Sequence, residues 1–420
     1  MRAALCAMTR ALPLAVTACL LFGAASAEAL PRMSLTAGSP CATCHVSPQG
    51  GGPRNEIGWG SELFTRAFGF ASVGLPKLDE QESNTFFEGK AMIGIDLRAQ
   101  LARLGRPKAD PSANAADATF SGFTPGTKPD LVYIPMQFMP YLTVLPTEWL
   151  TVTGSYNIST LAGSQYPGQM PWEAQVILHG DPMLPTLRAG MIQPTIGIRQ
   201  DDHTMLQRAD AMDPRRPLIP AGYAEWGGEL SWHPISWFRV EAGGFLNSNL
   251  REASQARVAD PVRTSSDGLA YSGRLSLMPQ FLDLGLNTWF GASVLGAGEL
   301  MAMHAFAGVG KNEWGSLQIE AARSTGASGY TTTAFTALAS WTAKEWLVVE
   351  ARGEMATSHA DLSGGAQDSE TRQLVLGVQF FPLPYVELRP EYRLIKVSHK
   401  TAATDEYILG QYTLQTHLFF

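Results

Sequence analysis

The sequence predicts an all-β protein, an antiparallel transmembrane β-barrel of about sixteen strands preceded by a small N-terminal segment. Three observations predict this fold. Apolar and polar residues alternate along many segments, short connections between these segments take turns with long ones, and residues after 27 contain no apolar run of the roughly 20 residues that a membrane helix needs. A chain with 45% hydrophobic but only 16% charged residues fits strands that have one apolar and one polar face.

The first 27 residues have the pattern of a cleavable signal peptide. Arg2 and Arg10 precede the apolar stretch 11–22, and Ala25-Ser26-Ala27 has the small-x-small form of a cleavage site. Lipoprotein processing at Cys19 is a weaker alternative because the apolar stretch continues past it. A membrane anchor is also weaker, since the stretch is too short to span. The pattern therefore predicts Sec export and cleavage after Ala27.

The chain contains four cysteines, and the signal peptide would remove Cys6 and Cys19. The two that stay form Cys41-Ala42-Thr43-Cys44-His45, the C-x-x-C-H pattern of covalent c-type haem attachment. Two thiols at this spacing reach the two vinyl groups of one porphyrin, and His45 is then the axial ligand of the haem iron. A redox C-x-x-C would need a βαβ setting, and a zinc site would need a second ligand pair. We expect one haem c, bound by Cys41, Cys44 and His45.

Residues 28–90 form the expected haem segment, which is too short for an independent cytochrome with a large core. Residues 48–53 are rich in Gly and Pro and predict a loop, and 59–68 predict a short helix. The apolar side of that helix would cover a haem face or pack on the barrel wall. Arg54 and Arg66 are candidates to pair with haem propionates, the alternative being solvated arginines.

Residues 91–420 form the expected porin-like barrel. In Val386 to Leu394, for example, apolar residues occupy every second position and charged residues fill most of the others. A soluble sandwich would turn such a polar face to water, but segments this long match tilted strands that cross a membrane around a polar lumen. The predicted strands are 91–103, 132–144, 149–159, 172–179, 186–194, 222–232, 237–246, 269–277, 282–294, 301–310, 316–324, 332–341, 347–356, 371–381, 385–396 and 408–420.

The two ends of this barrel are expected to differ. The long connections are predicted at 104–131, 160–171, 195–221, 247–268, 357–370 and 397–407, and tight turns alternate with them. Six tryptophans fall at the tight-turn end, where an interfacial girdle would lie: Trp149, Trp232, Trp237, Trp314, Trp341 and Trp346. With an even strand number, the haem segment starts at the periplasmic, tight-turn mouth, and it would lie there or inside.

Two other classes of function are excluded or poorly supported. The net charge of -7, without a Lys/Arg cluster, excludes a nucleic-acid partner. Hydrolase and nucleotide chemistry are poorly supported, since the sequence contains no G-x-S-x-G elbow and no phosphate-binding Gly loop.

The combination of a signal peptide, one C-x-x-C-H motif near the mature N-terminus and a porin-sized barrel resembles the fused monohaem c-type cytochrome–porins of the bacterial outer membrane. The iron-oxidising outer-membrane cytochromes are the best-known group of these proteins. The architectural resemblance covers the whole chain, but its specific motif is only Cys41 to His45. The following stretch Gly50-Gly51-Gly52-Pro53-Arg54-Asn55-x-x-Gly58 is similar to related uncharacterised haem-bearing porins and departs from the spacing of the iron oxidisers.

A haem of this kind takes a sixth ligand or keeps an open site. Met33 precedes the motif, and His203 in Asp201-Asp202-His203 lies within a long connection that would fold into the lumen. His203 is a candidate either for the sixth ligand or for a metal site in this loop, since carboxylates and imidazole suit hard or borderline cations such as iron. A solvated loop is the alternative. The other histidines of the mature chain are expected to be ordinary lumen or interface residues.

The resemblance implies electron transfer across the outer membrane by one haem. The lipid bilayer, a periplasmic c-type cytochrome and an extracellular redox partner are then the expected partners. The sequence leaves open the direction of transfer, the oligomeric state and an oxidoreductase activity toward a metal such as ferrous iron. The alternative function is a diffusion porin whose haem segment is a structural or regulatory plug.

Overall fold

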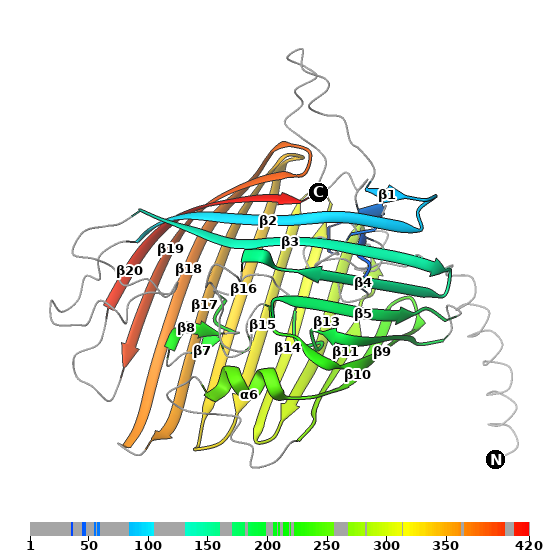
Figure 1. Ribbon diagram of the computed structural model, residues 1–420. Coiled ribbons are helices and arrows are strands. Elements are labelled where there is room, and N and C mark those ends of the chain that lie inside the picture. Colours follow the sequence, from blue (N-terminus) through cyan, green and yellow to red (C-terminus); the bar gives the residue numbers. More distant parts are fainter. Residues whose placement is uncertain are drawn as a thin grey trace, which may run out of the picture.

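Sixteen antiparallel strands close into one barrel in the computed structural model of the protein, and two short strands pair with the ends of wall strands (Figure 1). Strand β2 pairs with both β3 and β20, which closes the ring. The structure describes residues 35–36, 44–47, 54–55, 57–58, 84–104, 131–159, 170–180, 184–198, 205–207, 209–210, 213–217, 219, 222–255, 268–281, 284–312, 314–362, 365–399 and 407–419.

The wall strands follow one another around the ring in chain order. They are β2 (Ala91–Leu104), β3 (Leu131–Thr147), β4 (Leu150–Tyr156), β5 (Trp172–Leu178), β6 (Thr186–Ile192), β9 (Glu225–Ile235), β10 (Phe238–Phe245), β11 (Ala270–Leu277), β13 (Leu286–Ala297), β14 (Leu300–Lys311), β15 (Gly315–Thr325), β16 (Thr331–Lys344), β17 (Leu347–Leu362), β18 (Gly365–Leu383), β19 (Val386–His399) and β20 (Tyr407–Phe419). The short β1 (Thr85–Phe86) pairs with β2, and β12 (Gln280–Phe281) pairs with β13.

The strand pattern in the sequence is confirmed, because each of the sixteen predicted segments overlaps one wall strand. One predicted loop, 357–370, is wrong. Strands β17 and β18 continue through it, with Thr357 paired to Glu370 and Asp361 to Ala366. Most residues of this stretch are polar on both faces of the strands, so it lacks the alternation of apolar and polar residues that predicts a strand. The backbone ladder continues regardless, since cross-strand hydrogen bonds do not require apolar side chains.

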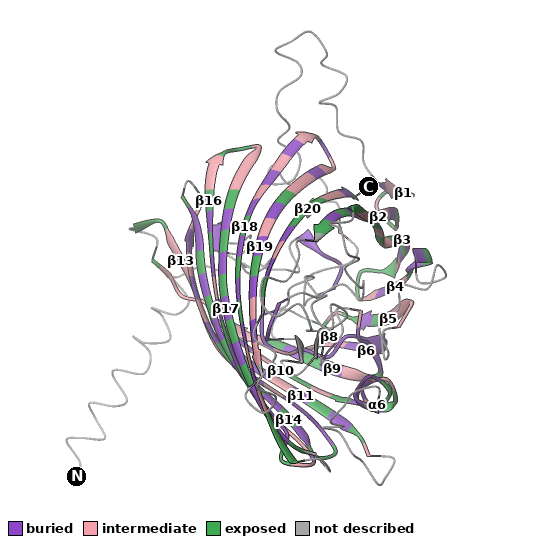
Figure 2. Cartoon of the chain, turned by 90° about the vertical axis from the view of Figure 1, so that its left-hand side faces the viewer, coloured by how far each residue is buried: buried purple, intermediate pink, exposed green. Residues whose placement is uncertain are grey.

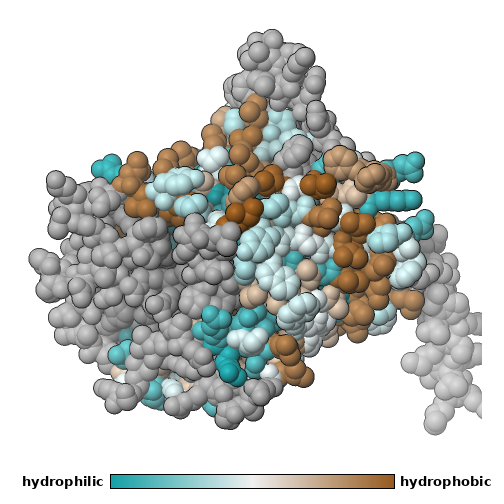
Figure 3. Space-filling model, in the orientation of Figure 1, coloured by the Kyte–Doolittle hydropathy of each residue, from teal (hydrophilic) through white to brown (hydrophobic). Residues whose placement is uncertain are grey.

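The alternation along each strand sorts side chains between the inside and the outside of the barrel. On β14, Met301 and Met303 are exposed while Ala302, His304 and Phe306 are buried. Figure 2 shows the same alternation of buried and exposed bands along β16 to β19. In Figure 3, hydrophobic and weakly polar residues cover much of the described outer wall that faces the viewer. The outer face is therefore mostly apolar, as the period of two predicts.

The two ends of the barrel differ in their connections. At the turn end the described connections are tight, with Glu148-Trp149 between β3 and β4 and Glu345-Trp346 between β16 and β17. The loop end carries the long connections, most of them between β2 and β11. All six tryptophans predicted for the girdle lie in turns or strand ends at the turn end, and five of them are exposed.

The loop-end half of the lumen contains most of the buried apolar core. One cluster joins the connections to the walls of β6, β10, β11, β13, β14 and β17 and includes Ile219, Tyr223, Phe245, Leu250 and Tyr330. A second cluster packs Leu206 against Ile395, Val397 and Leu409, with three alanines from β15, β16 and β17. The chain therefore packs part of its own connections against the inner wall in this half of the barrel.

Three elements inside the connections were not predicted. Strands β7 (Ala209–Asp210) and β8 (Asp213–Pro217) form a ribbon, and helix α6 (Ser248–Gln255) follows β10. The N-terminus of α6 is capped from outside the helix, since the Glu225 carboxylate accepts hydrogen bonds from the N–H groups of Asn249 (2.7 Å) and Leu250 (2.9 Å). Within the described part of the chain, no helix is long and apolar enough to cross a membrane.

Candidate functional site

The described half of the C-x-x-C-H motif lies inside the barrel at its turn end. Cys44 and His45 are buried, with 8% and 5% of their surfaces exposed. The next residue, Val46, packs on Met92 of β2 and Ile177 of β5, which face the lumen near the ends of their strands. The barrel wall thus holds this peptide at its mouth, where the sequence predicts the haem segment.

Arg54 connects the motif to the strand that closes the barrel. Its backbone forms an antiparallel bridge with His45, and its guanidinium carbon lies 4.2 Å from the ring centroid of Phe419, on β20. Burial lowers the pKa of Arg54, and the Asp96 carboxylate opposes that shift. Burial raises the pKa of the Cys44 thiol, and the charge of Arg54 partly offsets the rise. The motif therefore has a cation beside it, held between an aromatic ring and a carboxylate.

Asn55 and Gly58 hold the backbone of Cys44. The N–H of Asn55 donates to the carbonyl oxygen of Cys44 (3.1 Å), and the side-chain oxygen of Asn55 accepts the N–H of Gly58 (2.9 Å). A Cβ on Gly58 would overlap the same carbonyl oxygen of Cys44. These residues belong to the stretch 50–58 after the motif, and in the structure they hold the backbone of the motif.

Another part of the N-terminal segment contacts the opposite wall. The carbonyl oxygen of Leu35 accepts a hydrogen bond from Nδ2 of Asn287 on β13 (2.9 Å), and its side chain lies against Gly308 and Gly310 of β14. In the ring of sixteen, β13 is the eighth strand after β2, which is half of the circumference. The described pieces of residues 35–58 therefore touch both sides of the turn-end mouth.

Several predicted site residues lie outside the described part of the chain. They are Cys41, Met33, His203 and Arg66, together with the predicted signal peptide 1–27 and the predicted helix 59–68. Among the residues that are described, no group of three His, Cys, Asp or Glu side chains is arranged to hold a metal ion. The haem ligation, the sixth ligand and a loop metal site stay predictions.

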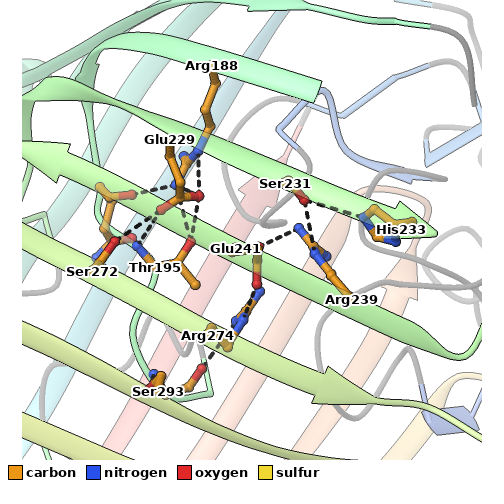
Figure 4. A network of polar contacts seen from close by, with 12 residues as sticks. Arg188, Thr195, Glu229, Ser231, His233, Arg239, Glu241, Ser272, Arg274 and Ser293 are labelled. Carbon is orange, nitrogen blue, oxygen red and sulfur yellow. Dashed lines mark hydrogen bonds and ion pairs between the residues drawn. The ribbon is translucent and has the colours of Figure 1, made fainter. Parts of the chain in front are cut away.

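The lumen wall between the two ends carries a network of buried ion pairs (Figure 4). Arg188 on β6 donates to Glu229 on β9 (2.9 Å), and Glu241 on β10 pairs with both Arg239 (2.6 Å) and Arg274. On the far wall, further pairs join Arg352 to Glu354 (3.0 Å) and Arg393 to Glu391 (2.7 Å). Each of these arginines has a carboxylate partner, so opposite charges compensate one another along the wall.

Two described parts of the connection between β6 and β9, residues 193–198 and 205–207, lie against the lumen wall, which is one of the two placements that the sequence leaves open for residues 195–221. We call these two parts the strap. Three of its backbone N–H groups donate to wall glutamates: Thr195 to Glu229 (3.0 Å), Ile198 to Glu320 (3.1 Å) and Leu206 to Glu354 (3.0 Å).

Gly197 brings the strap close to the wall. Its φ is +53°, and a Cβ would collide with the side chains of Glu320 and His304. The N–H of Gly197 also donates to Oγ of Ser293 (2.6 Å). The strap is thus fixed to the wall from β9 to β17 through contacts that use its backbone.

Sequence reasoning missed how these polar residues meet. Alternation places His417, Asp96 and Glu387 on the lumen face, but not next to one another. In the structure the ring of His417 lies between the carboxylates of Asp96 (3.0 Å) and Glu387 (3.1 Å), and it also packs beside Phe419. Barrel closure brings Asp96 and His417 together across 321 residues. Only the register of the closing strands carries that information.

No protein-family model matches this sequence, and no curated protein matches it. Among solved structures, the outer-membrane channel DcaP of Acinetobacter baumannii is 8% identical with a TM-score of 0.52, over 80% of this chain and 99% of that one. The anion-selective porin from Comamonas acidovorans is 13% identical with a TM-score of 0.48, over 79% and 99%. OpdK of Pseudomonas aeruginosa is 11% identical with a TM-score of 0.41, over 80% and 100%. At 8% identity the likeness to DcaP concerns the fold alone, and it shows that the chain has the fold of an outer-membrane channel barrel.

Proposed function

We propose that this protein is a bacterial outer-membrane barrel that carries one covalent c-type haem in its periplasmic mouth and passes electrons across that membrane. The observation that carries the proposal is the burial of Cys44 and His45 against the inner wall of the barrel. The porin-like fold and the apolar outer face support the membrane location. The tryptophans at the turn end support placing that end at a membrane interface.

The residues at this mouth fit a c-type haem. Cys44 supplies one attachment thiol and His45 the adjacent imidazole, while Arg54 supplies a cation close to both for a propionate. A c-type haem supplies a one-electron ferric–ferrous couple when bound. The chain's own residues hold the attachment peptide, exclude bulk water from Cys44 and His45, and keep the peptide on the lumen wall.

The lumen itself favours a conduit over an open pore. Apolar clusters of connection and wall residues lie in its loop-end half, and the strap is fixed across the wall between β9 and β17. The arginines of the central wall are matched with carboxylates, so their charges compensate in pairs instead of offering a row of free cations to a passing anion. Diffusion of a solute needs an open path along the lumen, whereas electron passage needs a redox partner that comes within tunnelling distance of the haem.

A diffusion channel is the second candidate, and the fold favours it, because the outer-membrane channel DcaP has a similar barrel. In that case the segment 35–58 at the mouth would be a structural or regulatory plug. The two functions differ in what must cross the barrel. A measurement that separates electron passage from solute leakage therefore decides between them.

The test uses liposomes that contain the purified protein, with horse cytochrome c and carboxyfluorescein trapped inside and a dextran-linked ferrous chelate outside. Neither protein nor dextran can cross a barrel of this size. A conduit predicts reduction of the trapped cytochrome c without loss of dye, and no reduction with the Cys44→Ala variant. Dye leakage without reduction would establish the diffusion channel instead, and absence of covalent haem from the parent protein would overturn both haem-bearing versions.

A further inference from the structure

We propose that Asn55 and Gly58 are positioning residues for the haem, which fix the backbone of Cys44 and His45 on the barrel wall. This inference rests on the proposed haem function and names how the chain sets the geometry of its attachment peptide. Nothing in the C-x-x-C-H motif specifies these two residues. Their role comes from the contacts of the turn that follows the motif.

The first contact fixes the carbonyl of Cys44. Asn55 donates its backbone N–H to this oxygen, next to the bridge that pairs His45 with Arg54. The peptide group that joins Cys44 to His45 is therefore held from one side by the returning chain. Because the proximal imidazole and one attachment thiol flank this peptide group, its orientation sets where both side chains point.

The second contact fixes Asn55 itself. Its side-chain oxygen accepts the N–H of Gly58, and this closes a short turn that brings Gly58 onto the carbonyl of Cys44. The approach leaves no room for a Cβ, so the turn can pack this closely only with glycine at 58. Gly58 is buried, whereas its neighbour Ile57 is 61% exposed. Close packing is thus confined to the side of the turn that faces the motif.

The third contact ties the turn to the wall. Arg54 lies over Phe419 of the last strand, and Val46 packs on the wall on the other side of the motif. Cys44 and His45 are consequently held between two wall contacts, with the turn closing over them. The orientation of a haem bonded to Cys44 and ligated by His45 would be set by these contacts.

The decisive variant is Gly58→Ala, with Gly353→Ala as its matched control, since a Cβ at Gly353 has no atom within 4 Å. Asn55→Ala removes the acceptor for the Gly58 N–H, and Asn55→Asp keeps it. All four variants retain Cys41, Cys44 and His45. We therefore expect haem staining to persist in each of them, while the haem environment changes in Gly58→Ala and Asn55→Ala.

The readouts are the visible spectrum in both oxidation states and the midpoint potential of the purified full-length protein. Gly58→Ala and Asn55→Ala are expected to shift the potential and the spin-state bands, and Asn55→Asp and Gly353→Ala to resemble the parent. The positioning role is overturned if Gly58→Ala has the parental spectrum and potential. It is likewise overturned if Asn55→Asp behaves like Asn55→Ala.

A second measurement does not depend on haem. In reduced, haem-free protein refolded into detergent, a maleimide labels thiols, and mass spectrometry reads the extent of labelling at Cys44. We expect labelling to be about fivefold faster in Gly58→Ala, the order of change that loss of one hydrogen bond gives in an opening equilibrium. Parental labelling rates in Gly58→Ala would overturn the positioning role. Absence of haem from the exported parent would instead overturn the proposed function and leave this result intact.

Discussion

Two pieces of chain lie inside the barrel, and they are held by different kinds of contact. The strap is bound through backbone N–H groups to buried glutamates, two of which also pair with wall arginines. The N-terminal segment is held by apolar packing at Val46 and Leu35, by one cation–π contact, by one neutral hydrogen bond from Asn287 to the carbonyl oxygen of Leu35, and by bonds within its own turn. The strap therefore belongs to the wall, whereas the segment is docked on it.

The largest effect should come from breaking the charged anchor of the strap. Glu229→Ala leaves the guanidinium of Arg188, which is 3% exposed, without its carboxylate and frees the N–H of Thr195. We expect the free energy of unfolding of the barrel to fall by about 3 to 5 kcal/mol, as for other broken buried ion pairs. Urea unfolding of the barrel in lipid bilayers measures this change.

Two variants calibrate this loss. Glu229→Gln keeps an acceptor for Thr195 and should cost less than Glu229→Ala, and Glu148→Ala in an exposed turn should be close to neutral. A loss in Glu229→Ala no larger than that in Glu148→Ala would contradict the distinction between strap and segment.

A smaller effect is expected from detaching the strap at Gly197. Gly197→Ala adds a Cβ against Glu320 and His304 at a residue whose φ is +53°. Strain of this kind costs about 1 to 3 kcal/mol, so the strap should leave the wall while the barrel stays closed. Single-channel conductance should rise in Gly197→Ala and stay at the parental value in Gly353→Ala. An unchanged conductance would mean that the strap does not narrow the lumen.

The smallest effect is expected at the docked segment. Arg54→Ala removes the cation from the ring of Phe419, a contact of about 0.5 to 2 kcal/mol. Because the barrel does not depend on this contact, we expect faster cleavage of the N-terminal segment by chymotrypsin without a change in urea unfolding of the barrel. Arg54→Lys should lie between the parent and Arg54→Ala. A destabilised barrel in Arg54→Ala would show that the segment is part of the wall after all.

The strands were predictable because a period of two is a local signal, and each strand carries it independently of its neighbours. The polar hairpin at 357–370 was misassigned as a loop for the same reason, since its residues lack the apolar face that the pattern requires. Helix α6 escaped prediction because its N-terminus is capped by Glu225, a residue 23 positions before the first helical residue Ser248. Local sequence does not contain a cap supplied by another strand.

The candidate site was predictable only in its chemistry. The spacing of Cys41, Cys44 and His45 indicates haem, but nothing in it indicates that the barrel wall buries Cys44 and His45. The anchors of the segment, at Asn287 and Phe419, lie hundreds of residues away along the chain. Such contacts depend on barrel closure and register, which alternation does not specify.

The contact of the segment with both sides of the mouth sets an order of assembly. Leu35 bonds to Asn287, which lies 252 residues later, and Arg54 needs Phe419, at the end of the closing strand. The Phe419 anchor is available only when nearly the whole chain has been exported, and the Asn287 anchor when about two-thirds of it has. Docking of the segment at both anchors therefore follows the placement of β20. A chain whose segment is seated on Phe419 has, by that fact, its last strand in place.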